Sequence, residues 1–267
     1  MDMSFEVPMA ACDQRMRSLV HRMLGGSAAA SLEAYQLNEW LSFVAHGTTP
    51  QGSLVIAAAP QEILGTIPPG FHVEVRLDLI KQTLDPSVTI LAAAAHVLGT
   101  LTWATPGEAA EHLASGLLPE RVVETLTVPG ARLGFIEVDQ LMLRDMTGAA
   151  WLPVELLDRH TPTAIEDEHD AFGVVAEYDN EALKDLCRAV MGGSIPGIVT
   201  YDHPLAGICA HTAGRVFCLD VDTTGITVML ISPHETLRVF AQFPEPATSQ
   251  SELPHLIGSV MRAAASV

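Results

Sequence analysis

Short runs of hydrophobic residues, separated by turn-forming clusters, dominate the first part of the chain after an amphipathic start. Apolar or alternating runs occur at 41–45, 54–59, 73–80, 89–94 and 98–104. Runs of this length and period are typical of strands, and several strands at such spacing favour a barrel or sandwich. Before them, the pattern predicts a helix from Arg15 to Leu24 that ends at Gly25-Gly26.

Helix signals of a different kind follow the strand pattern. The segment Thr105-Pro106-Gly107-Glu108 combines an N-cap, a proline at the first helical position and the acidic residue of a capping box. A second short helix is expected at Pro119–Leu126, and strands are expected again between Arg132 and Leu157. The uncharged stretch from Pro86 to Gly107 alternates in its second half, which indicates strands and not a membrane span.

A change from strand to helix pattern near residues 160–162 predicts a domain boundary. Thr163 and Glu166 form a second predicted capping box, Asp179 is expected to cap the next helix, and Gly192-Gly193 to end it. Strand-like runs lie at 198–201, 216–221, 226–231 and 237–243, and Ser251 is expected to cap a last helix with Pro254 in its first turn. The predicted fold class is therefore α+β, with a barrel domain at 1–158 and a small helix-led α+β domain at 163–267.

The charge balance excludes several classes of partner. The chain has 32 acidic and 14 basic residues, for a net charge of −18. Binding to nucleic acid or to anionic membranes needs a basic surface, so neither is expected. The first twenty residues carry charges and no apolar signal core, which predicts a cytoplasmic protein with reduced, buried cysteines.

Motifs that carry chemistry are weak. His203, Cys209, His211 and Cys218 are residue types that bind zinc, but the spacing lacks paired knuckles, so buried cysteines in a sheet are the favoured interpretation. The glycine-rich segment 192–197 follows a helix and lacks the lysine of a phosphate-binding loop. No nucleophile carries a local signature.

The distribution of cations argues against a conventional flavin site. There is no Lys or Arg between Met23 and Val75, and Arg76 and Lys81 are the nearest cations after that stretch. The phosphate of flavin mononucleotide (FMN) normally takes charge-assisted donors, preferably arginine. Arg76, Arg121 and Arg132 are candidates to converge on a phosphate from elsewhere in a dimer.

Two segments carry a resemblance to a known family. Residues 166–171, Glu-Asp-Glu-His-Asp-Ala, are similar to the acidic-His-Ala segment that opens the C-terminal domain of some split-barrel proteins of the pyridoxamine phosphate oxidase superfamily. Residues 237–244, followed by the capped helix at Ser251, resemble the last strand and helix of that domain. A leading helix and opening strands at 30–35 and 41–45 fit the same pattern. The nearest resemblance is to haem-utilisation (HugZ-type) proteins and plant glutamyl-tRNA-reductase-binding proteins.

The resemblance implies a homodimer whose barrels form a cleft for flavin or haem. His169 matches the second histidine of the family's segment, while an acidic residue replaces the first; Arg76 is the nearest cation for a cofactor. The alternative for His169 is a structural residue at a helix N-terminus among carboxylates. His255 lies in a different local pattern, so no haem ligand is carried over near the C-terminus.

Two functions follow from the resemblance. The first is a haem- or tetrapyrrole-binding protein without conventional flavin oxidase activity, for which the resemblance also allows haem breakdown. The second is a non-enzymatic regulatory or protein-interaction module that has lost its cofactor. An absorption spectrum with added haem or flavin distinguishes them.

Overall fold

The structure is a computed structural model that describes residues 9–156, 165, 167–202, 212–232 and 235–266. Its contacts group into two compact units. The C-terminal unit contains residues up to Leu19, residues 82–92 and residues from Thr163 on; the barrel unit contains residues 20–81 and 93–162. The predicted domains, 1–158 and 163–267, stay a prediction.

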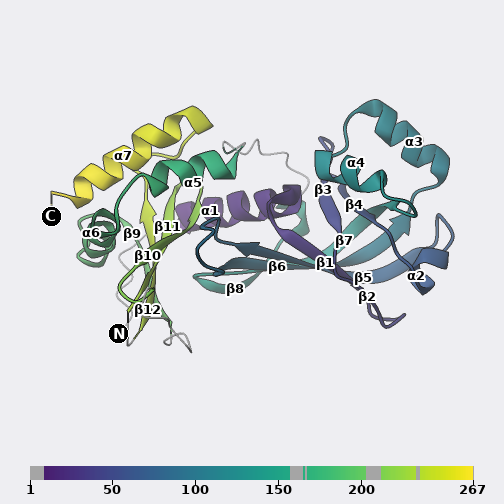
Figure 1. The fold of residues 1–267 in the computed structure, drawn as a ribbon, viewed down its shortest axis with the longest axis horizontal. Coiled ribbons are helices and arrows are strands. Elements are labelled where there is room, and N and C mark those ends of the chain that lie inside the picture. The colour runs from purple at the N-terminus through teal and green to yellow at the C-terminus, as the bar shows by residue number, and fades with distance from the viewer. Residues whose placement is uncertain (1–8, 157–164, 166, 203–211, 233–234, 267) are drawn as a thin grey trace. The chain divides into compact units, whose positions relative to one another are not determined.

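The barrel unit is built on an antiparallel sheet that is strongly curled into half a barrel (Figure 1). The sheet has eight strands in the order β2-β1-β5-β6-β7-β4-β3, with β8 paired to β7. The strands are β1 (Ala29–Ala34), β2 (Glu39–Leu41), β3 (Ala45–Thr48), β4 (Leu54–Ala58), β5 (His72–Gln82), β6 (Leu91–Trp103), β7 (Arg132–Asp145) and β8 (Gly148–Leu152). The predicted α+β class, with an N-terminal half-barrel sheet and a following helix-led α+β part, is confirmed.

One strand replaces two of the predicted ones. The runs 89–94 and 98–104 were expected as separate strands, but residues 91–103 form the single strand β6. The linking residues Ala95, His96 and Val97 contain no turn former, so nothing interrupts the extended backbone there.

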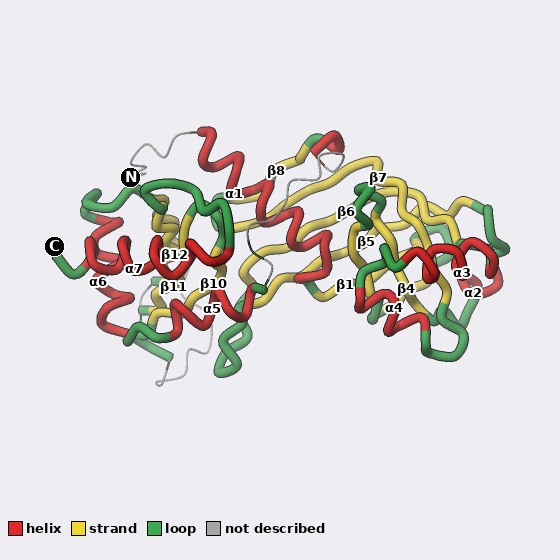
Figure 2. Tube along the Cα trace, turned by 90° about the horizontal axis from the view of Figure 1, so that it is seen from above, coloured by secondary structure: helices red, strands yellow, loops and turns green. Residues whose placement is uncertain are grey.

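The helices of the barrel unit are α2 (Ile63–Thr66), α3 (Pro106–Ser115) and α4 (Glu120–Leu126), together with a π-helical turn at Met23–Ser27. This turn continues α1 (Met9–Arg22), most of which belongs to the C-terminal unit. Helix α4 buries Val122 against Val55 and Leu133 of the sheet, and Figures 1 and 2 show α4 beside β4. The first helix starts at Met9, earlier than the predicted Arg15, because the residues before Arg15 include good helix formers.

The capping box at Thr105 is confirmed. The Thr105 hydroxyl accepts a hydrogen bond from the backbone N–H of Glu108 (3.2 Å), and the Glu108 carboxylate accepts from the backbone N–H of Thr105 (2.8 Å). These bonds satisfy two of the N–H groups that a helix start leaves unpaired.

A buried histidine ties the π-helical turn to the sheet. His46 of β3 is 3% exposed, and its Nε2 lies 2.7 Å from the carbonyl oxygen of Met23. Burial lowers the pKa of His46. The neutral ring therefore donates Nε2–H to this carbonyl, because a carbonyl oxygen can only accept.

Besides most of α1, the described part of the C-terminal unit contains a four-stranded sheet and three helices. The strands are β9 (Gly197–Asp202), β10 (Val216–Val221), β11 (Gly225–Ile231) and β12 (Thr236–Gln242), in the order β10-β11-β12-β9. The helices are α5 (Glu168–Ala176), α6 (Asn180–Met191) and α7 (Leu253–Ala264), and Figure 2 shows them gathered around the sheet. Their apolar faces share one core with the sheet, which includes Val175, Leu186, Val239 and Ile257. The other face of the sheet packs on Val88 and Ile90 of the β5–β6 connection and on Ala92 at the start of β6.

The helix starts of this unit agree only in part with the predicted ones. The capping box of Thr163 and Glu166 lies outside the described residues; α5 is capped by Asp167, whose carboxylate accepts from the N–H groups of His169 and Asp170. Asp179 caps α6 as predicted, through the N–H of Ala182. The prediction of Ser251 as the cap of α7 was wrong, because Ser251 lies inside a 3-10 turn at Gln250–Glu252 that leads into the helix.

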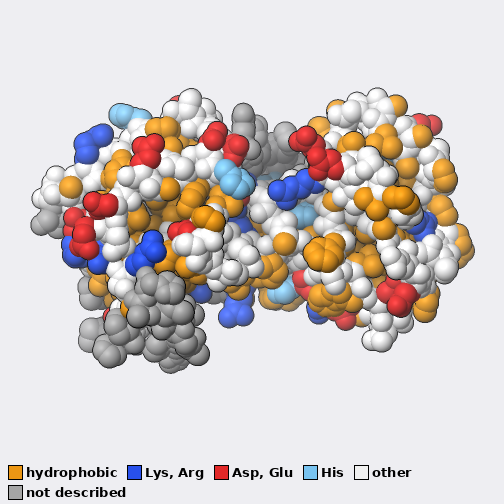
Figure 3. All heavy atoms as spheres, viewed as in Figure 1, with side chains coloured by type: hydrophobic (Ala, Val, Ile, Leu, Met, Phe, Trp, Pro, Cys, Tyr) orange, Lys and Arg blue, Asp and Glu red, His pale blue; other side chains and the backbone are white. Residues whose placement is uncertain are grey.

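The helices and the cysteines bear on two predictions from the sequence: that no segment spans a membrane and that the cysteines are buried. Among the described residues, no helix has both the length and the apolar character that a bilayer span requires. Cys187 and Cys218 are buried, and burial raises the pKa of Cys187 to about 12, so its thiol stays protonated. On the face drawn in Figure 3, acidic side chains are scattered among hydrophobic and uncharged ones.

Candidate functional site

A row of large and charged side chains crosses one face of the curled sheet. Strand pairing places Glu33 opposite both Trp40 and Arg76, and it places Met142 opposite both His96 and Trp151. Directly opposed residues of antiparallel strands project from the same face. Asp78 joins the two halves through its contacts with Arg76 and His96. We call this set the cross-strand row: Trp40, Glu33, Arg76, Asp78, His96, Met142 and Trp151.

Charged groups occupy the centre of the cross-strand row. Arg76 Nη2 lies 2.8 Å from Glu33 Oε2 and 3.0 Å from Asp78 Oδ2, and Arg76 Nε donates to the same Asp78 oxygen at 3.1 Å. The other Asp78 oxygen, Oδ1, lies 2.5 Å from His96 Nδ1. The Asp78 side chain is only 11% exposed, so both of its oxygens are held by neighbours on the sheet.

The Asp78 contact orients the imidazole of His96. A carboxylate only accepts hydrogen bonds, so it holds the proton on Nδ1 and leaves the lone pair of Nε2 outward. The His96 side chain is 34% exposed, and it makes no other hydrogen bond within the described part of the chain. A histidine whose second nitrogen is fixed by a carboxylate is the usual arrangement of a metal-ligating imidazole.

The surroundings of His96 combine apolar surface with cations. Met142 lies opposite His96, and Trp151, beyond Met142, is 62% exposed. Arg144 is paired with Ala94, two residues before His96, so its exposed side chain leaves the sheet on the same face. The imidazole thus has Arg76 on one side, shared with acidic partners, and Arg144 on the other. This surface fits a flat, mainly apolar ligand that carries a ligating atom at its centre and carboxylates at its edge.

The two residues predicted to bind a cofactor lie in different units. Arg76 belongs to the cross-strand row, where acidic groups share its charge. His169 lies in the first turn of α5; its side chain is 78% exposed, and its Nδ1 is 3.8 Å from Asp167 Oδ1. Cofactor binding by Arg76 and by His169 stays a prediction. The alternative for His169 was a structural residue at a helix N-terminus among carboxylates, and His169 does lie in that environment.

The weak zinc candidate is only partly described. His203, Cys209 and His211 lie outside the described residues, and Cys218 is buried in the core of the C-terminal unit. Within the described residues, no three ligating side chains of His, Cys, Asp or Glu come together.

The other arginines considered for a flavin phosphate bind backbone groups. Arg121 donates to the carbonyl of Gly26 at 3.0 Å. Arg132 donates to the carbonyls of Gly65 (3.1 Å) and Ile67 (2.8 Å) and lies over the ring of Trp103. These contacts give both guanidinium groups structural roles. Weak FMN binding stays a prediction.

Sequence reasoning did not identify His96 as a candidate. The signal available was a single imidazole inside a long uncharged strand. Its partner Asp78 lies on another strand, and only the pairing of β5 with β6 brings the two together.

Comparisons with known proteins give limited information. No protein-family model and no curated protein matches the chain. Among solved structures, a haem-binding protein from Mycobacterium smegmatis is 13% identical with a TM-score of 0.49, covering 98% of this chain and 100% of its own. A protein of unknown function from Agrobacterium tumefaciens is 15% identical with a TM-score of 0.38 over 98% and 100%. A putative general stress protein 26 from Jannaschia sp. is 13% identical with a TM-score of 0.35 over 68% and 91%. Similarities this low carry no information about ligand or activity.

Proposed function

We propose that this protein binds haem or a related tetrapyrrole on the cross-strand row, with His96 as the iron ligand, and that it has no conventional flavin oxidase activity. The observation that carries the proposal is the contact of 2.5 Å between His96 Nδ1 and Asp78 Oδ1 on an open sheet face. It supports an imidazole whose Nδ1 is held by a carboxylate and whose Nε2 is oriented outward. A histidine is a common axial ligand of haem.

The rest of the row fits the remaining parts of a tetrapyrrole. Met142 and Trp151 offer apolar and aromatic surface beside the imidazole. Arg144 and Arg76 lie on the same face and would bind the two propionates, because a guanidinium group pairs well with a carboxylate. When bound, the iron would supply the ligand-binding or redox chemistry of the cofactor. The chain's own contribution is to orient His96 through Asp78 and to hold the ligand's carboxylates.

A second copy of the chain is part of this proposal. A tetrapyrrole on an open sheet would keep one face in water, and the exposed indoles of Trp40 (52%) and Trp151 (62%) extend the same surface. A two-fold partner would cover this face with its own copy of the row. Light scattering at micromolar concentration is expected to report twice the mass of the 28.5 kDa chain, and Trp151→Glu to shift it toward the single chain. A wild-type protein that stays at the mass of one chain would refute the dimer.

Hemin titration tests the ligand assignment. The wild-type protein is expected to shift the Soret band of added hemin, and His96→Ala to abolish that shift and weaken binding at least about tenfold, or 1.4 kcal/mol. The matched control is His72→Ala on β5, which removes an imidazole hydrogen-bonded to Thr102 of β6 in the same sheet. Asp78→Asn should give a Soret shift between those of the wild-type protein and His96→Ala, because the imidazole loses its charged partner.

The same titration decides between His96 and His169. If His169→Ala loses the Soret shift and His96→Ala keeps it, the ligand lies on α5 and our assignment is wrong.

FMN serves as the comparison ligand: the cation-free stretch between Met23 and Val75 leads us to expect no submicromolar binding by calorimetry near physiological salt. Protein that is yellow on purification would contradict this part.

A non-enzymatic interaction module is the second candidate function. Phe43 is 92% exposed just after β2, and Tyr35 at the start of the β1–β2 turn is 47% exposed. Exposed aromatic side chains of this kind are common in protein-binding surfaces. A wild-type protein that leaves the hemin spectrum unchanged would favour this function. Haem breakdown and the cytoplasmic location stay predictions.

A further inference from the structure

Arg76 and Arg144 lie on opposite sides of His96 along the sheet. Arg76 precedes Asp78, the partner of His96, by two residues on β5, whereas Arg144 follows Met142, which is paired with His96, by two residues on β7. Strands β5 and β7 are the two neighbours of β6 in an antiparallel sheet, so they run in the same direction. Two residues back on one strand and two residues forward on the other therefore lead away from His96 in opposite directions.

Strand geometry gives the separation of the two arginines. Neighbouring strands lie about 4.8 Å apart, and a strand rises about 3.4 Å per residue. Arg76 and Arg144 differ by two strand spacings and four residues, so their Cα atoms would lie roughly 17 Å apart on a flat sheet. The curl of the sheet shortens this distance but leaves the two residues on opposite sides of His96. Each arginine therefore lies beside a different edge of a flat ring that is centred over His96.

Both guanidinium groups retain N–H donors for a ligand. The Nε and Nη2 atoms of Arg76 contact Asp78 and Glu33, and its Nη1 has no partner among the described residues. Arg144 is exposed and makes no hydrogen bond or ion pair within the described part of the chain. Guanidinium N–H groups form strong, charge-assisted hydrogen bonds with carboxylates. Each arginine can therefore bind a ligand carboxylate without releasing an acidic group of the protein.

Apolar side chains flank His96 along its own strand. Ala94 and Leu98 lie two residues before and after His96 on β6, so they project from the same face of the sheet. Met142 of β7 lies opposite His96, and Trp151 of β8 lies beyond it. A flat ring centred on His96 would thus rest on apolar side chains in both directions along β6, with one arginine at each end of the diagonal.

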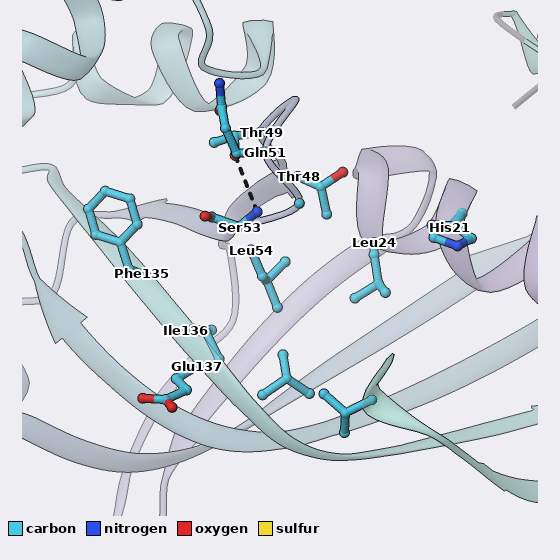
Figure 4. A pocket seen from close by; sticks show the side chains of 13 residues that line it. His21, Leu24, Thr48, Thr49, Gln51, Ser53, Leu54, Phe135, Ile136 and Glu137 are labelled. Carbon is cyan, nitrogen blue, oxygen red and sulfur yellow. Dashed lines mark hydrogen bonds between the residues drawn. The ribbon is translucent and has the colours of Figure 1, made fainter. Parts of the chain in front are cut away.

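A cavity at the edge of the half-barrel offers no comparable pair of cations. It has a volume of about 480 Å³ and is bordered by the end of α1, the β3–β4 turn and the middle of β7 (Figure 4). Its polar lining includes the hydroxyl and amide side chains of Thr48, Gln51 and Ser53, and no Lys or Arg is among its described lining residues. The carboxylates of a ligand therefore have stronger partners beside His96 than in this cavity.

We propose that the preferred ligand is a tetrapyrrole with carboxylates on opposite edges of its ring, one bound by Arg76 and the other by Arg144; this inference rests on the proposed function. The two propionates of haem leave the same edge of the porphyrin, so haem meets both arginines only if their side chains bend toward that edge. A ring with carboxylates on opposite edges meets each arginine on its own side of His96. The two arginines then select among tetrapyrroles, while His96 keeps its role as the iron ligand.

Two isomeric iron porphyrins test the proposal: iron mesoporphyrin IX, whose propionates are on adjacent pyrroles, and its isomer with the propionates on opposite pyrroles. The isomers have the same charge, so the net charge of −18 repels both equally. In Soret titrations of the wild-type protein, the opposite isomer is expected to bind at least about tenfold more tightly. Equal affinities, or tighter binding of the adjacent isomer, would overturn the proposal. No Soret shift with either isomer, or shifts that persist in His96→Ala, would instead reject the proposed function and this inference with it.

A charge-neutralising variant locates the carboxylate partner. Arg144→Gln is expected to remove most of the preference for the opposite isomer, because one of its carboxylates then has no guanidinium partner. The Soret maximum of the bound adjacent isomer should stay unchanged in this variant, since Arg144 does not contact His96 or Asp78. Arg188→Gln is the matched control: it removes an exposed cation of α6 in the C-terminal unit and should keep the full preference. An Arg144→Gln variant that keeps the full preference would rule out the assigned partner.

Discussion

Replacing Trp103 by alanine is expected to lower the free energy of unfolding of the barrel unit by about 3–5 kcal/mol. Trp103 ends β6, is 1% exposed, and donates its Nε1–H to the carbonyl of Leu64 at 3.1 Å. The guanidinium of Arg132 lies 4.8 Å from the centre of its ring. Gly134, directly opposite on β7, leaves space for the ring, since a Cβ there would lie 3.0 Å from two of its carbons. Alanine would remove the packing, the hydrogen bond and the cation–π contact together.

Urea unfolding followed by circular dichroism measures this effect. Trp103→Phe keeps an aromatic ring but leaves the Leu64 carbonyl without its donor, so we expect an intermediate loss of about 1–3 kcal/mol. Trp151→Ala is the matched control, because that indole is 62% exposed and contributes little to the core. A Trp103→Ala variant within about 1 kcal/mol of the wild-type protein would show that this corner repacks.

Replacing Asp222 by alanine is expected to destabilise the C-terminal unit by about 3 kcal/mol, the order of cost for unpairing buried donors to a charged acceptor. Asp222 is 3% exposed in the turn between β10 and β11. Its Oδ1 accepts from the N–H and the hydroxyl of Thr224, both at 2.6 Å, and from the N–H of Gly225 at 3.1 Å. Alanine would leave these buried donors without that acceptor.

The control for this turn is Asp222→Asn, which keeps a side-chain oxygen and removes the charge. We expect it to lose less than half as much stability as Asp222→Ala. Hydrogen exchange at the Gly225 amide should accelerate in the alanine variant before exchange in α7 does, because the broken bonds are local to the turn. Equal stability of the wild-type and alanine proteins would contradict this account of the hairpin.

Local signals in the sequence were sufficient for most elements. The pairing of Thr105 with Glu108 and the cap at Asp179 involve residues within a single helical turn, and both are present as predicted. The strand at 216–221 was predicted with its observed bounds, because apolar residues and flanking turn formers mark it. The cap of α7 was missed for a local reason. A 3-10 turn at Gln250–Glu252 precedes the helix, so α7 begins at Leu253, after Ser251, and a capping rule does not detect such a turn.

The candidate sites, in contrast, depend on strand pairing. The sequence by itself determined the fold class, the caps of α3 and α6 and the absence of cations between Met23 and Val75. Only the tertiary structure decided that Asp78 orients His96 and that Arg144 lies on the same face. The physical reason is range: caps and apolar periods act between neighbours in the chain, whereas register is set by contacts between distant strands, and a shift of one residue turns each side chain to the opposite face.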